Sequence, residues 1–230
     1  MGAEAKIVLS WLMFGGTHII GSSIRVRTYL IETLGLIRFK VLYSVIAFAT
    51  FLPLCYVYFL EKHAGIQLFT PTIELHYLAQ ALILFSFITL FQGLMTLNTQ
   101  TTLAELTGRF PEQARGIQRI TRHPQNFSFS LLGIAHCLVL PFVGDWLFFG
   151  GFVVYGVLSA LHQDRRARVT GPEAVKQFQA ETSFVPFAAI LTGKQRLAFS
   201  EYHVIGVVVA LGLYITLSIF HGLLFGGFGG

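Results

Sequence analysis

The sequence has few charged residues. Asp, Glu, Lys and Arg make up 12% of its 230 residues, about half of the ~25% that is usual in soluble proteins. This composition excludes a disordered chain and a charged coiled coil, which both need many more charges. The two cysteines, Cys55 and Cys137, both lie in apolar runs and are too few for a zinc-finger array or a disulfide framework.

Apolar residues, by contrast, are abundant. Hydrophobic residues make up 54% of the chain, and 23 residues are Phe. Because roughly 17–25 helical residues cross a bilayer, the sequence predicts an all-α membrane bundle of about six transmembrane helices. The chain is expected to form one membrane domain over residues 1–230, with 163–201 as a cytoplasmic or interfacial loop. The expected spans are approximately residues 5–22, 38–60, 75–97, 126–142, 146–162 and 202–225.

The basic residues predict the orientation of these spans. Of the 16 Lys and Arg residues, only Lys6 and Lys62 lie on the side of the N-terminus. The positive-inside rule therefore places the other side in the cytoplasm, with both termini outside, and a bacterial inner membrane is expected. Because topology explains this charge, we expect a lipid bilayer as the partner and no nucleic acid. The residues on the cytoplasmic side are Arg25, Arg27, Arg38, Lys40, Arg109, Arg115, Arg119, Arg122, Arg165, Arg166, Arg168, Lys176, Lys194 and Arg196.

Histidines, and not carboxylates, are the polar residues inside the expected spans. The absence of mid-span acids argues against a carboxylate-based proton pump. His18 and His136 lie on different spans, and counting 1.5 Å per residue puts them roughly 10 and 15 Å from the cytoplasmic boundary. Two imidazoles at similar depth are suited to clamp one metal ion. His221 is expected nearer the outer face.

The residue supply favours haem over zinc at such a site. Structural zinc takes about four nitrogen or sulfur ligands, whereas haem iron takes one or two from the protein and its ring suits a Phe-rich bundle. Arg119 and Arg122, with Arg25 and Arg27, are candidate partners for the haem propionates. The residues alone leave two alternatives open for the histidines, namely hydrogen bonding between helices and proton handling. His123 is a further candidate for an anion or propionate contact, and with Arg122 it equally fits a basic helix cap at the lipid headgroups.

Five motifs occur in an order that resembles the NnrU family, which includes the 15-cis-zeta-carotene isomerases of plants and cyanobacteria. They are Thr17-His18 with Ser22, Arg119-Ile-Thr-Arg-His-Pro-Gln125, Ala135-His136, Asp164-Arg165-Arg166, and Thr182-Ser-Phe-Val-Pro-Phe-Ala-Ala-Ile190.

This resemblance implies a haem b protein with His18 and His136 as axial ligands. Its most concrete activity would be redox-dependent cis–trans isomerisation of a lipid-soluble polyene, which makes a carotenoid the expected hydrophobic substrate. The isomerase has a cysteine three residues before the second histidine, proposed as an alternative ligand, and this chain has Gly133 there. A His-to-Cys ligand switch is therefore not expected.

Two other functions compete with isomerisation. Bacterial NnrU proteins are associated with denitrification genes, so the chain could be a non-enzymatic haem protein linked to nitric oxide metabolism. The Arg-His-Pro piece also occurs in small membrane methyltransferases. Those enzymes have a tyrosine three residues after that histidine, where this chain has Asn126.

Overall fold

The structure, a computed structural model, describes residues 1–96, 102–111 and 113–226, without the side chains of Thr102 and Leu103. All regular elements in this part of the chain are helical, which confirms the predicted all-α class. They are α1 (Ala3–Gly21), α2 (Ile24–Leu34), α3 (Leu36–Glu61), α4 (Ile73–Met95), α5 (Thr102–Thr107), η1 (Gly116–Arg119), α6 (Pro124–Val139), α7 (Val143–Thr170), α8 (Glu173–Glu181), α9 (Ala188–Leu191), η2 (Phe199–Glu201) and α10 (Val204–Phe225).

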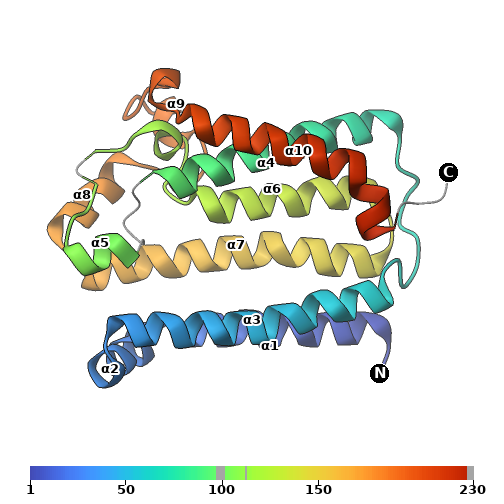
Figure 1. Cartoon of the computed structure of the whole chain (residues 1–230), viewed down its shortest axis with the longest axis horizontal. Helices are drawn as coiled ribbons and strands as arrows, with labels where there is room; N and C mark the ends of the chain where they lie inside the picture. The colour runs from blue at the N-terminus through green and yellow to red at the C-terminus, as the bar shows by residue number, and fades with distance from the viewer. Residues whose placement is uncertain (97–101, 112, 227–230) are drawn as a thin grey trace.

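Six long helices lie side by side along one axis, with α7 in the middle of the bundle (Figure 1). One face of α7 packs against α1, which packs against α3, and α3 also contacts α7 directly. Another face packs against α6, which contacts α4, and α4 in turn contacts α10. The helix α7 therefore links the pair α1 and α3 to the group formed by α6, α4 and α10.

Each of the six expected spans coincides with one of these helices, but their lengths differ. Among the described residues, α3, α4, α7 and α10 are long and apolar enough to cross a membrane. A fifth span is obtained if α1 and α2, which meet at a 66° bend, are counted together. The 16 residues of α6 extend for about 24 Å, short of the ~30 Å hydrocarbon core. The expected count of about six is thus approximate, and Leu97, the last residue of the third expected span, lies outside the described residues.

The outermost helices have the surface of a protein immersed in lipid. The only buried residues of α10 are Gly206 and Ala210, and large apolar side chains cover the rest of it, as at Ile219 and Leu223, which are 70% and 83% exposed. Such a surface is stable only in an apolar solvent. The protein is therefore an integral membrane protein.

The helices α6 and α7 form a close-packed hairpin. Pro124 begins α6, where a missing backbone N–H costs nothing. A Cβ added at Gly133 would lie 2.4 Å from the carbonyl oxygen of Phe149, and one added at Gly156 would lie 2.4 Å from Oγ of Ser130. Glycine at both positions allows the two backbones to approach more closely than any side chain would permit.

The short helices α2, α5, α8 and α9 gather at one end of the bundle, together with most of the basic residues; we call this the basic end (Figure 1, left). The helix α8 begins directly after Pro172, and its buried residues are Val175 and Phe178. At the opposite end, Asp145 is fully buried and accepts hydrogen bonds from the Tyr58 hydroxyl and the His63 backbone. That carboxylate anchors the start of α7 to the end of α3.

Candidate functional site

An apolar pocket of about 480 Å³ lies between α1, α3, α6 and α7 in the half of the bundle nearer the basic end. This volume is within the usual range for small-molecule sites. Among the described residues, His18 is the one histidine that lines it, and the cations Arg27, Lys40 and Arg166 also line it. Its aromatic lining residues are Phe14, Phe39, Tyr43, Phe48, Phe51, Phe129, Phe152 and Tyr155.

The imidazole of His18 is held by aromatic rings. Its centroid lies 4.4 Å from the ring of Tyr43, 5.3 Å from Phe14 and 5.6 Å from Tyr155. The Tyr43 hydroxyl donates a hydrogen bond to the His18 carbonyl at 3.0 Å, which ties α3 to the end of α1. No hydrogen bond of the described residues involves the His18 ring nitrogens, so they are available to a ligand in the pocket.

His136 lies in a different environment. Its ring stacks on Phe149 at 4.1 Å and 7°, and its Nδ1 is 2.8 Å from the Leu132 carbonyl oxygen. That contact favours a proton on Nδ1 and a free lone pair on Nε2. Its neighbouring histidine ring is that of His221, 6.5 Å away between centroids.

The structure does not bring His18 and His136 together. His18 is near the end of α1 that joins α2, whereas His136 is near the end of α6 that leads to α7, at the opposite end of the bundle. They contact α7 at Tyr155 and Phe149 respectively, which are about 9 Å apart along a helix axis. The expected similar depth is therefore wrong, because the count for His18 ran to Arg25, which lies beyond the 66° bend after α1, so His18 is closer to the end of its helix than the count gave.

Arg119 binds an acidic residue that the sequence analysis did not pair with it. Its Nε and NH2 donate to both carboxylate oxygens of Glu201 at 2.8 and 2.6 Å, and NH1 donates to Gln195 at 2.7 Å. These hydrogen bonds lower the pKa of Glu201 to about 2 and raise that of Arg119. Such a bidentate pair fixes the loop before α10 against η1. Arg119 also lines a second, polar pocket of about 490 Å³ with Lys194 at the basic end.

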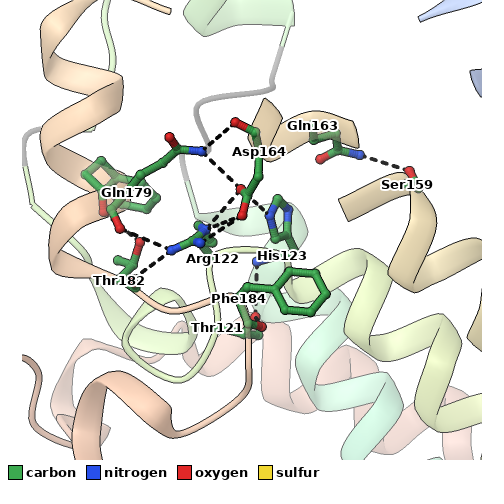
Figure 2. Close-up of polar contacts among 10 residues, drawn as sticks. Thr121, Arg122, His123, Ser159, Gln163, Asp164, Gln179, Thr182 and Phe184 are labelled. Atoms are coloured by element: carbon green, nitrogen blue, oxygen red, sulfur yellow. Dashed lines mark hydrogen bonds and ion pairs between the residues drawn. The ribbon is translucent and has the colours of Figure 1, made fainter. Parts of the chain in front are cut away.

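Arg122 and His123 bind the carboxylate of Asp164 on α7 (Figure 2). Arg122 donates from Nε and NH2 to the two carboxylate oxygens at 3.0 and 2.8 Å, and from NH1 to the carbonyl oxygens of Gln179 and Thr182. His123 Nε2 lies 2.8 Å from Asp164 Oδ1. The guanidinium is thus occupied by the protein itself, and this cluster joins α6, α7 and α8.

Two predictions about the arginines change accordingly. Neither Arg119 nor Arg122 lines the pocket that contains His18, because each is engaged by a carboxylate from a distant part of the chain. Of the four arginines expected at the propionates, Arg27 lines that pocket and Arg25 does not, and the other cations that line it, Lys40 and Arg166, were not expected there. The Asp164-Arg165-Arg166 motif contained a usable signal: a helix places residues two apart on different faces, so one charge can pair with Arg122 while the other faces the pocket.

The family model described as NnrU protein matches residues 6–227. The chain belongs to the NnrU family. Its similar curated relatives are 15-cis-zeta-carotene isomerases of chloroplasts, one from Zea mays (35% identical over 91 residues) and one from Arabidopsis thaliana (33% over 90 residues). Each alignment covers 38% of this chain and 24% of the relative, so the chain spans about a quarter of the length of the curated relatives it matches. No solved structure matches this NnrU chain.

Proposed function

We propose that this NnrU protein is a membrane-embedded cis–trans isomerase of a lipid-soluble polyene and that it works with haem b. The observation that carries the proposal is the pocket around His18. It lies between membrane-spanning helices, it is lined mainly by aromatic rings, and it contains one imidazole among the described residues. The zeta-carotene isomerase relatives supply the class of substrate, since a carotenoid is a long apolar polyene.

The residues of the pocket fit a haem with one protein ligand. Its aromatic walls suit the flat apolar macrocycle, and His18 offers ring nitrogens that no other described residue uses. Arg27, Lys40 and Arg166 provide the cations that propionates need. Among the described residues no three His, Cys, Asp or Glu side chains meet to hold a metal ion, so a cofactor that brings its own four nitrogens is a better match than a bare ion. When bound, the haem would supply redox-active iron able to act on a conjugated double bond.

The fit does not extend to His136. That residue does not line the pocket, and it contacts α7 at Phe149, whereas His18 contacts α7 at Tyr155. We therefore propose His18 as the haem ligand from this chain. Substituting His18 and His136 separately tests the pair that the family resemblance implies.

The remaining lining residues position the polyene. Phe129 on α6 and Phe152 on α7 stack at 6.4 Å and 23°, and Phe51 on α3 meets Phe152 edge-on at 6.1 Å. These rings exclude water and hold an apolar chain by dispersion contacts. No carboxylate side chain of the described residues lines the pocket, so these residues offer no carboxylic acid–base step at the double bond. These residues bind and orient the polyene and exclude water from it.

The experiment is a spectrum followed by a turnover assay. The protein is produced with ample haem, purified, and examined for a Soret band; 15-cis-zeta-carotene is then added to the oxidised and the reduced protein, and isomers are separated by chromatography. We expect haem, and isomerisation only in the reduced state. His18→Ala should lose the haem, and His76→Ala, an exposed histidine on α4, should keep it.

Other outcomes would refute parts of the proposal. Haem without isomerisation would favour the non-enzymatic accessory function. A protein with no Soret band in either variant or parent would remove the haem proposal. Loss of haem from His136→Ala but not from His18→Ala would assign the haem ligand to His136 instead of His18.

A further inference from the structure

Two cations at the pocket share one carboxylate. Glu105 of the short helix α5 is 2.8 Å from an Arg27 guanidinium nitrogen on α2 and 2.6 Å from Lys40 Nζ on α3. The side chains are half-buried, with 19% of Arg27, 25% of Lys40 and 17% of Glu105 exposed. Glu105 Oε2, the oxygen facing Lys40, makes no well-directed hydrogen bond, so that contact is an ion pair alone.

This arrangement differs from the other arginine pairs at the basic end. Arg119 and Arg122 each bind a carboxylate through two parallel hydrogen bonds and use a third donor on another protein oxygen. Arg27 and Lys40 instead divide a single carboxylate, and Arg166 lines the same pocket close to both Arg27 and Glu105. Positive charge is therefore in excess at the mouth of an apolar pocket. Half-buried charge of one sign is costly unless an anion joins it. The pair is therefore poised to accept another anion.

A hydrocarbon polyene makes no favourable electrostatic interaction with these cations. It has no charged group, and placing it beside a guanidinium and an ammonium would only cost their hydration. The cations suit a different occupant, one with an apolar body in the aromatic part of the pocket and an acidic group at the end facing Arg27 and Lys40.

We infer that Arg27 and Lys40 bind the carboxylates of an amphiphilic ligand, and that Glu105 occupies their place until the ligand binds. This inference rests on the proposed function, in which the ligand is haem and the carboxylates are its propionates. It assigns the cationic mouth to the cofactor and the aromatic walls to both cofactor and polyene. Glu105 then competes with the ligand for Arg27 and Lys40, and it ties α5 to these two residues only while the ligand is absent.

The test compares single variants of the full-length protein in nanodiscs, each checked for a monodisperse profile. Arg27→Gln and Lys40→Gln remove the proposed contacts. Two exposed arginines provide matched controls, because Arg25 is two residues before Arg27 on α2 and Arg38 two residues before Lys40 on α3. Each protein is loaded with haem or with haem dimethyl ester, which lacks the carboxylates, and the rate of transfer to apomyoglobin is measured.

We expect haem to leave Arg27→Gln and Lys40→Gln about tenfold faster than the parent, the size of effect that a lost charge-assisted hydrogen bond produces. Arg25→Gln and Arg38→Gln should release it at the parental rate. The dimethyl ester should leave all five proteins equally fast. Glu105→Gln should retain haem longer than the parent, because its competing charge is gone, whereas a purely structural Glu105 would give faster loss.

Equal losses of haem and ester from Arg27→Gln and Lys40→Gln would overturn the inference and leave the haem proposal standing. If the parent takes up neither form, the haem proposal fails, and the same proteins are compared for binding of parinaric acid and its methyl ester. A preference for the acid that both substitutions abolish would support the cationic mouth; no preference would overturn it.

Discussion

Gly133 allows a direct test of how tightly α6 and α7 pack. A Cβ at this position would lie 2.4 Å from the Phe149 carbonyl oxygen and 3.2 Å from both Phe152 Cβ and Val153 Cγ2. Because the first of these atoms is backbone, α7 itself must move. Gly133→Ala should therefore destabilise the protein by about 1–3 kcal/mol or more, the usual cost of overpacking. In a chain of this length that corresponds to roughly 2–12 °C in Tm.

Gly150→Ala is the matched control, since it lies on α7 and a Cβ there meets nothing within 4 Å. That change should be neutral or stabilise by up to about 1 kcal/mol through lost backbone entropy in the unfolded chain. Thermal unfolding in nanodiscs, followed by circular dichroism, measures both. If Gly133→Ala melts at or above the temperature of Gly150→Ala, the close approach of α6 to α7 is refuted. Gly133→Cys should destabilise the protein more than Gly133→Ala, because its side chain is larger.

Three further predictions concern the basic end. Asp164→Asn should destabilise the protein by about 3–5 kcal/mol in the same unfolding assay, because it leaves a largely buried guanidinium without its anion. Glu201 has a folded pKa of about 2, below the ~4.3 of an unfolded Glu, so its pairing with Arg119 stabilises above pH ~4.3 and is lost as the pH falls towards the folded pKa; Glu201→Gln should flatten the dependence of Tm on pH in that window. Single cysteines at Phe110 and Thr170, in a cysteine-free background, should resist membrane-impermeant labelling of intact bacterial cells and react after lysis, and strong labelling of intact cells would reverse the expected orientation.

The all-helical architecture was predictable from the sequence because a helix that lies in lipid needs a long run of apolar residues, and such runs are visible in the composition of each segment. Every apolar run expected to span coincides with a helix in the part of the chain that the structure describes. The number of spans was less accessible. The end of α6 is set by Leu140 and Pro141 rather than by a change in hydropathy, and the bend between α1 and α2 occurs at Ser22 and Ser23 without a proline to announce it.

The pairing of charges was not predictable, because it depends on contacts across the fold. Arg122 and Asp164 are 42 residues apart, and Arg119 and Glu201 are 82 apart. A search of the neighbouring sequence for acids misses both partners. Arg27, Lys40 and Glu105 likewise come from three helices, and nothing in the local sequence distinguishes the two cations from the exposed arginines beside them. Only the family motif containing Asp164 pointed towards one of these contacts.

The two intramembrane histidines show how a correct choice of residues can be joined to a wrong geometry. Counting residues gives depth along one helix, but a shared ligand also requires that two helices face each other. In this bundle α7 packs against both α1 and α6, and its side chains at Phe149 and Tyr155 each meet a different histidine. A ligand held by His18 therefore touches the α1 face of α7 and, through Arg27 and Lys40, the basic end. His136 does not line that pocket, so its substitution should alter the properties of the pocket, through α7 and the pocket-lining part of α6, without removing a contact from it.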